Sequence, residues 1–424
     1  GGGWKTYLLV TFIEAIVGVF LIYPFIGLAD GFSRWNLAIE ICENGRIVSD
    51  TLLSPFIAYV QALTWKVFNS YAVYTLFQAW LFYIAIGVNV RELLISKWWW
   101  IVVAQIIVLF PTVYIFPLLL TDSAPTYIFI VLLISILKQN RSVWNAAAIV
   151  VLVFLCVGVR VNSLVLMMLI ASAYAVLAII RKTSKIRYVL TTAAVMMGMI
   201  LGVILPSKLS PSNHNASVLG MVWEMTGICA QYPSDSLKND LAQYGDINDA
   251  VSRYGEPYLN SIVWDNNPPY PAFDISSYEE SRSLTTIYIN QIFHNTKHFL
   301  EIKKQFVFSA LGISNQLITS RRGVHGVDDR TIAYGALPTA RQNDIRELFF
   351  NTTDRIGFIS LRPIVITMLA LLIGLLMKIC KIECRVYFDY ILTAIGYYSS
   401  FLINTQAHEY RYFAPSFYIL SVVS

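Results

Sequence analysis

The chain has 424 residues, of which 56% are hydrophobic and 13% are charged, and its mean hydropathy is +0.59. Soluble domains carry about 25% charged residues, so this composition excludes an ordinary soluble protein and favours a helical bundle in lipid. The formal net charge is only +5, and no basic run is dense enough to predict a nucleic-acid-binding surface.

The first predicted element is a membrane span over about 5–27, after three glycines that resemble a tag or a processing scar. An outer loop with an amphipathic stretch over 31–50 follows it. Residues 52–68 are apolar but short, and Pro55 interrupts their start. A crossing helix needs roughly 20 apolar residues, so two paths are open: 52–68 either spans the membrane or lies along its outer interface.

Basic residues decide between the two paths, because they collect in cytoplasmic loops. With 52–68 in the interface, six further spans are predicted: 70–90, 98–118, 124–138, 143–160, 163–180 and 187–206. The basic residues that this path places in the cytoplasm are Arg91, Lys97, Lys138, Arg141, Arg181, Lys182, Lys185 and Arg187. The other path would move the whole set outside, so the in-plane position is favoured.

A polar segment over 207–357 comes next, outside the cytoplasm and rich in Asn, Asp, Tyr and Pro. Its stretch 298–312 has apolar residues at helical spacing, which predicts an amphipathic helix docked on the membrane surface. Spans over 358–379 and 386–404 follow, and 413–424 begins another.

The expected fold is an all-α polytopic membrane protein with about ten transmembrane helices. Its parts are a transmembrane module over 4–206 with an outer loop over 28–69, a helical or irregular outer segment over 207–357, and C-terminal helices over 358–424.

Four polar sites fall at outer turns of this path, although only basic residues were used to choose it. Asp30 and Arg34 follow the first span, Asp122 lies at the next outer turn and Arg160 at a third. The fourth is His408-Glu-Tyr-Arg-Tyr412. Each site alone has a simpler explanation: a turn carboxylate, a helix cap, a snorkelling arginine or an interfacial aromatic belt. Together, carboxylates and arginines facing one cavity favour transfer from a lipid-linked phosphate donor.

The order of these motifs resembles the GT-C superfamily of membrane glycosyltransferases. The acidic residue after the first span matches Asp30, and the phrase Ser54-Pro-Phe-Ile-Ala-Tyr59 follows the in-plane segment. Asp122 matches the second acidic site, and Arg411-Tyr-Phe-Ala-Pro415 matches the late Arg-Tyr-x-x-Pro motif. The resemblance covers about 5–205 and 358–424 but not 207–357. Many relatives carry Asp-Glu at the first motif, whereas Gly31 follows Asp30 here, which leaves a metal or paired-acid role there in doubt.

The resemblance implies a GT-C-like bundle and a polyprenyl-phosphate sugar donor, most often undecaprenyl phosphate in bacteria. It implies inverting transfer to a glycan, lipid or protein acceptor at the outer face of the bacterial cytoplasmic membrane. Asp30 would deprotonate the acceptor hydroxyl, Arg411 or Arg160 would bind the donor phosphate, and Asp122 would shape the pocket. The further substrate-pocket residues are Arg34, Tyr59, His408, Glu409 and Tyr412. No metal-ligand set is predicted, and a divalent metal stays an open alternative.

Two rival functions act on the same lipid-linked sugars. A polysaccharide polymerase or ligase would use outer arginines, which the segment supplies at Arg321, Arg322, Arg330, Arg341 and Arg346. A transporter or flippase would need charges or broken helices at the membrane midplane, where these spans are apolar. In the outer segment, Trp223, Trp264, Tyr258 and Tyr270 would either stack on sugars or form a small core. Cys42 and Cys229 both fall outside, so a disulfide between them is also open.

Overall fold

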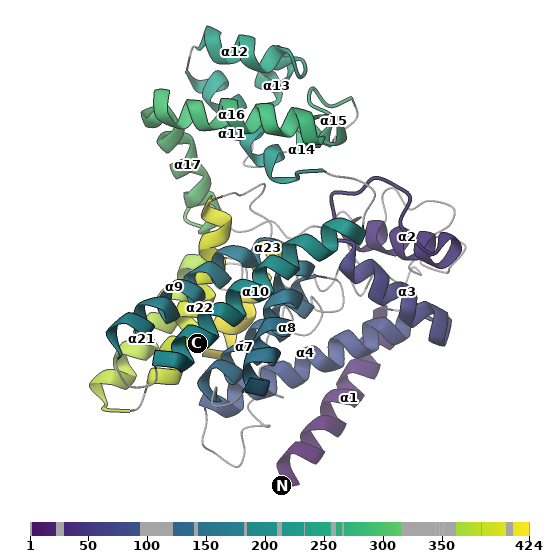
Figure 1. Ribbon diagram of the computed structural model, residues 1–424, viewed down its shortest axis with the longest axis vertical. Coiled ribbons are helices and arrows are strands. Elements are labelled where there is room, and N and C mark those ends of the chain that lie inside the picture. The colour runs from purple at the N-terminus through teal and green to yellow at the C-terminus, as the bar shows by residue number, and fades with distance from the viewer. Residues whose placement is uncertain are drawn as a thin grey trace.

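The computed structural model describes residues 2–22, 29–93, 122–139, 143–181, 185–209, 214–232, 234–255, 260–264, 267–314, 344, 347, 351, 362–382, 384–403 and 410–423. Within these residues the secondary structure is helical, without strands (Figure 1). The predicted span 98–118 and the five arginines of the stretch 321–346 lie outside them. Helices occupy the described parts of the other predicted spans.

The helices of the N-terminal module are α1 (Gly2–Ile22), α2 (Ala29–Asn44), α3 (Phe56–Phe68), α4 (Tyr71–Leu93), α7 (Ser123–Gln139), α8 (Val143–Val159), α9 (Ser163–Ile180) and α10 (Lys185–Leu209). Those of the following segment are α11 (Ser217–Gln231), α12 (Asp235–Ala242), α13 (Ile247–Arg253), α14 (Asn260–Val263), α15 (Ala272–Ser276), α16 (Tyr278–His294) and α17 (Thr296–Ala310). The C-terminal helices are α21 (Pro363–Ile379), α22 (Arg385–Ile403) and α23 (Tyr410–Val423).

Among the described residues, four helices are long and apolar enough to cross a membrane, which indicates a membrane protein. They contain the stretches Gly3–Phe20, Ala72–Leu93, Ser163–Ile180 and Lys185–Leu209. Helix α3 has only 13 residues, so at a rise of about 1.5 Å per residue it measures about 20 Å. This is less than the hydrocarbon thickness of roughly 30 Å, and α3 is therefore too short to cross alone.

Small residues bring the central helices close together. Helix α10 packs along α8 and α9, and its Gly198 and Gly202 face α8. A Cβ atom at Gly198 would lie 2.7 Å from Cβ of Val153, and one at Gly202 would lie 2.7 Å from Cβ of Val157. Two glycines four residues apart thus allow the backbones to approach where no larger side chain fits.

Charged and polar residues from several helices meet at one end of the bundle, around Glu92. Helices α1 and α4 run antiparallel, since Trp80 donates to the carbonyl of Leu8 (3.2 Å) and Arg91 lies over the ring of Trp4. Next to Arg91, the carboxylate of Glu92 accepts from Lys138 (2.7 Å) and from the hydroxyl of Tyr390 (2.9 Å). The ends of α4 and α7 and the start of α22 therefore meet at one end of the bundle.

The segment between α10 and α21 contains a compact helical subdomain, α11–α17, which lies beyond the bundle in Figure 1. Helix α11 lies at the centre of this subdomain, where it packs against α16 and α17. Glu224 of α11 is buried and accepts from Lys303 of α17 and from the hydroxyl of Tyr288 of α16 (2.7 Å). Burial raises the pKa of the Glu224 carboxyl, and the charge of Lys303 opposes this shift. The sequence alone left this segment as helical or irregular.

The stretch 298–312 is helical as predicted, but its apolar face has a different partner. Ile302 and Phe306 of α17 are buried, and Phe306 packs edge-on against the indole of Trp223, with ring centroids 5.1 Å apart. The face expected to dock on the membrane therefore packs within the subdomain, because α11 offers it an apolar surface. Trp223 and Tyr270 are buried in the core of this subdomain, whereas Trp264 is exposed.

Candidate functional site

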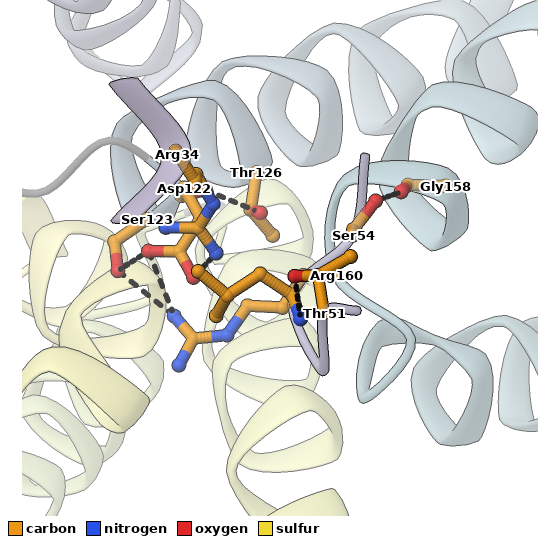
Figure 2. Close-up of polar contacts among 9 residues, drawn as sticks. Arg34, Thr51, Ser54, Asp122, Ser123, Thr126, Gly158 and Arg160 are labelled. Atoms are coloured by element: carbon orange, nitrogen blue, oxygen red, sulfur yellow. Dashed lines mark hydrogen bonds and ion pairs between the residues drawn. The ribbon is translucent and has the colours of Figure 1, made fainter. Parts of the chain in front are cut away.

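Three residues from separate elements come together at the end of the bundle opposite Glu92. Arg34 of α2 places Nη2 3.2 Å from Oδ2 of Asp122, and Arg160 places Nη1 3.7 Å from Oδ1 of the same carboxylate (Figure 2). The side chains of Arg34, Asp122 and Arg160 are only 4%, 14% and 8% exposed. We call this group, with Ser123, the two-arginine cluster. Two guanidiniums and one carboxylate give it a formal charge of +1.

The start of α7 presents Asp122 to both arginines. The backbone carbonyl of Asp122 accepts from the amide of Thr126 (3.2 Å) and from its hydroxyl (2.7 Å), as at the first turn of a helix. The side chain of Asp122 points to the arginines (Figure 2). Ser123 joins the cluster because its hydroxyl accepts from Nη1 of Arg160 (2.8 Å) and donates to Oδ1 of Asp122 (3.3 Å). Both carboxylate oxygens of Asp122 are therefore engaged.

Arg160 lies in the short turn between α8 and α9. Its amide donates to the carbonyl of Cys156 (3.1 Å) and closes α8, and its carbonyl accepts from the amide of Ser163 (2.9 Å), which begins α9. Its guanidinium lies 5.5 Å from the ring centroid of Phe401 in α22. Arg160 is thus buried against an aromatic ring from the C-terminal helices, and it does not extend to the membrane surface as a snorkelling arginine would.

The connection between α2 and α3, residues 45–55, ties the cluster to neighbouring helices, and we call it the strap. Glu40 of α2 accepts from the amides of Val48 and Ser49, both at 3.1 Å. At the far end of the strap, the hydroxyl of Ser54 donates to the carbonyl of Gly158, two residues before Arg160 (Figure 2). The strap therefore joins α2, which carries Arg34, to the end of α8, which precedes Arg160.

Two hydroxyls near Arg160 were not predicted from the sequence. Tyr397 of α22 and Ser163 of α9 are both completely buried. Arg160 and Asp122 act electrostatically on the hydroxyl of Tyr397. The ring of Tyr397 also lies beside Phe401, with centroids 5.5 Å apart. A tyrosine inside an apolar span carries no signal that points to an arginine in another helix, so only the packing of α22 reveals this neighbour.

The remaining predicted site residues fall partly outside the described side chains. Asp30 lies in the first turn of α2, four residues before Arg34, and Arg411 and Tyr412 lie in the first turn of α23. The side chains of these three residues lie outside the described part, as do His408 and Glu409 entirely. Tyr59 is not part of the two-arginine cluster. Its hydroxyl donates to the carbonyl of Leu209 at the end of α10 (3.4 Å).

The backbone of α23 begins beside the two-arginine cluster. Phe413, in its first turn, stacks on Tyr398 of α22, with centroids 4.5 Å apart. Phe413 also packs against Phe401, with centroids 5.2 Å apart, and Phe401 in turn contacts Arg160. The first turn of α23, which includes Arg411, therefore lies close to Arg160, with the ring of Phe401 between Phe413 and the guanidinium.

Two other predictions concern thiols and metal ligands. Cys42 and Cys229 are both free thiols, so the disulfide that the sequence left open is not formed. The Cys42 thiol contacts the carbonyl of Ala62 (3.6 Å), and Cys229 is buried in α11. Among the described residues no three His, Cys, Asp or Glu side chains gather as a metal site would require. Of the aromatic candidates in the outer segment, Tyr258 lies outside the described residues.

Compared with known protein families, with curated proteins and with solved structures, the chain gives no match. The case for a function therefore depends on the geometry of the two-arginine cluster and on the order of motifs along the sequence.

Proposed function

We propose that the chain is a membrane glycosyltransferase with a GT-C-like bundle of about ten spans. It takes a sugar from a polyprenyl-phosphate donor and transfers it, with inversion, to a glycan, lipid or protein acceptor. The reaction takes place at the outer face of the bacterial cytoplasmic membrane. The observation that carries this proposal is the two-arginine cluster: three elements far apart in the sequence place two buried arginines around one carboxylate at one end of the bundle.

A buried group with net positive charge suits a phosphate. Guanidinium groups pair with phosphate oxygens through paired N–H donors, and such contacts are stronger when water is excluded. Asp122 pairs with both arginines, and the hydroxyl of Ser123 accepts from Arg160 and fixes its position. We assign Arg160 to bind the donor phosphate, supported by Arg34, which pairs with the same carboxylate. We assign Arg411, in the first turn of α23, to the same phosphate.

The two acidic residues take different roles. Both oxygens of Asp122 face arginines or Ser123, so Asp122 positions these groups and is a poor base. Asp30 is assigned as the general base. It lies four residues before Arg34 in α2, and residues at this spacing share one face of a helix. The backbone position of Asp30, about one turn before Arg34, supports this assignment.

The transfer step follows from these assignments. The acceptor oxygen forms a bond to the anomeric carbon of the sugar while the bond from that carbon to the phosphate oxygen breaks. The hydroxyl proton passes to the carboxylate of Asp30, and the polyprenyl phosphate leaves with the electron pair. Arg160 and Arg411 stabilise the charge that develops on the leaving phosphate. Arginines that bind this charge more tightly in the transition state than in the bound donor accelerate the reaction.

The test uses the purified chain in nanodiscs with radiolabelled polyprenyl-phosphate sugars, and it follows label in the lipid, the acceptor and free sugar. Asp30→Asn, Arg160→Gln and Arg411→Ala are compared with Arg46→Gln, which changes an exposed arginine of the strap. We expect the Asp30 variant to lose about 100-fold or more in transfer, the arginine variants to lose donor turnover, and Arg46→Gln to retain both.

Different results would support the rival functions. Full activity in Asp30→Asn would contradict the assigned base. Growth of the lipid-linked chain, without transfer to another acceptor, would identify a polymerase. Movement of intact donor between the two leaflets, without loss of its sugar, would identify a flippase.

A further inference from the structure

Two buried hydroxyls lie beside Arg160, and that of Tyr397 interacts with the guanidinium of Arg160 itself. The oxygens of Tyr397 and Ser163 are inaccessible and have no partner of normal geometry. Hydroxyls in this state are rare in folded proteins, because a buried polar group without a partner costs free energy. Such groups point to a ligand that supplies the missing hydrogen bonds.

Both hydroxyls belong to elements that surround Arg160. Ser163 lies in the same turn, where its amide donates to the carbonyl of Arg160 (2.9 Å). Tyr397 lies across the helix interface, where α22 packs against α9. At this interface a Cβ atom on Gly396 would lie 3.1 Å from Leu166. The charges of Arg160 and Asp122 act on the hydroxyl of Tyr397, so these polar groups share one small region.

The chemistry of these groups selects an anion. Arg160 can only donate hydrogen bonds, and the hydroxyls of Ser163 and Tyr397 are each able to donate one. Ser163 also begins the 18-residue helix α9, whose dipole favours negative charge at this end. A phosphate offers several acceptor oxygens to donors that converge from different directions, and its negative charge complements the guanidinium of Arg160.

We infer that Arg160, Ser163 and Tyr397 form a binding site for a phosphate ester, with the two hydroxyls donating to its oxygens. We call these three residues the phosphate cradle. The inference rests on the proposed function, since it names the residues that bind the phosphate of the donor. It assigns Ser163 and Tyr397 as binding residues, roles that the sequence motifs did not give them.

The experiment measures direct binding without any sugar transfer. The purified chain in an uncharged, phosphate-free detergent is titrated with geranyl phosphate, with inorganic phosphate and with geraniol. The variants are Tyr397→Phe and Ser163→Ala, and Tyr174→Phe at the other end of α9 is the matched control. We expect each cradle variant to bind geranyl phosphate about ten- to a hundred-fold more weakly, the loss of one hydrogen bond to a charged group. Tyr174→Phe should bind as the unchanged protein does.

Thermal melting without ligand separates binding from structural roles. Tyr397→Phe should melt at or above the temperature of the unchanged protein, because it removes a buried hydroxyl that has no hydrogen-bond partner of normal geometry. A lower melting temperature for this variant would show that the hydroxyl stabilises the fold, and it would overturn the inference. Unchanged affinity for geranyl phosphate in both variants, or equal binding of geraniol, would also overturn it.

The source of the phosphate and the proposed function are tested separately. Tight binding of geranyl phosphate with weak binding of inorganic phosphate supports a lipid-linked ligand, and equal binding of both supports free phosphate in the same cradle. If the cradle binds phosphate esters but the chain transfers no sugar, the proposed function fails and the cradle stands. If sugar transfer proceeds and Tyr397→Phe leaves donor binding unchanged, the cradle fails and the function stands.

Discussion

Replacing Asp122 by Asn tests whether its carboxylate holds two buried arginines in place. The substitution keeps the size of the side chain and one oxygen acceptor, but it removes the negative charge. The cluster then changes from a formal charge of +1 to +2. Arg34 and Arg160, which are 4% and 8% exposed, would remain buried near one another without the negative charge of Asp122.

The expected loss of stability follows from the two distances. At 3.2 Å and 3.7 Å, and with an effective dielectric constant of about 20, each arginine attracts the carboxylate by about 5 kcal/mol. Desolvation of the three charges offsets much of this attraction. Removal of one partner from a buried pair typically costs about 3–5 kcal/mol, and the retained amide oxygen favours the lower value. We expect a loss of about 3 kcal/mol, or about 6 °C in melting temperature at roughly 2 °C per kcal/mol.

The assay is thermal unfolding in detergent, with Asp50→Asn as the matched control. Asp50 is 65% exposed, lies 3.8 Å from His214 and belongs to the strap near the same end of the bundle. Exposed pairs contribute roughly 0–1 kcal/mol, so this control should melt within about 2 °C of the unchanged protein. Added phosphate should recover more stability in Asp122→Asn than in the control, because a ligand that binds the folded state stabilises it. Equal melting of the two variants would refute the reasoning.

Two further predictions concern the bundle and the subdomain. Gly198→Leu should destabilise the chain by at least about 1–3 kcal/mol through overpacking against Val153, whereas Gly255→Ala, at a site with nothing within 4 Å, should melt normally. If Gly198→Leu melts like Gly255→Ala, the close approach of α10 to α8 is disproved. The pKa of Glu224 is raised by burial, so Glu224 contributes stability below the pKa of the unfolded chain that is lost as the pH rises through its folded pKa. Glu224→Gln should therefore gain stability relative to the unchanged protein as the pH rises above about 4.5, and parallel melting profiles for the two proteins would contradict this assignment.

Two residues of the two-arginine cluster, Asp122 and Arg160, could be selected from the sequence because each stands at a turn. In an apolar chain, a charged residue beside a span is conspicuous, and alternating spans bring every second turn to the same end. Asp122 and Arg160 were selected in this way. Their mutual contact was not predicted, because it depends on the rotation of α7 and α8 about their axes. The distance of 3.7 Å between them comes from packing, for example from the fit of Gly202 against Val157.

Two features had no usable signal in the sequence. Tyr397 resembles any aromatic residue of a span, and its proximity to Arg160 arises only when α22 packs against α9. Glu224 and Lys303 are 79 positions apart, and each is an ordinary charged residue of an amphipathic helix. Their pairing requires α11 and α17 to lie side by side. Contacts that are distant in sequence follow from topology, which hydrophobic periodicity does not encode.

The contact between Arg160 and Phe401 has a consequence for biosynthesis. A ribosome delivers α1 to α10 long before α22 exists, and the helical subdomain emerges between them. During that interval Arg160 has Asp122 and Ser123 as neighbours but lacks the aromatic ring that later covers it. Helices α22 and α23, which are synthesised later, close this polar end by packing against α9, α7 and α4. A chain released before α22 is made would therefore leave Arg160 without the ring of Phe401, and the charged end of the bundle would be incompletely packed.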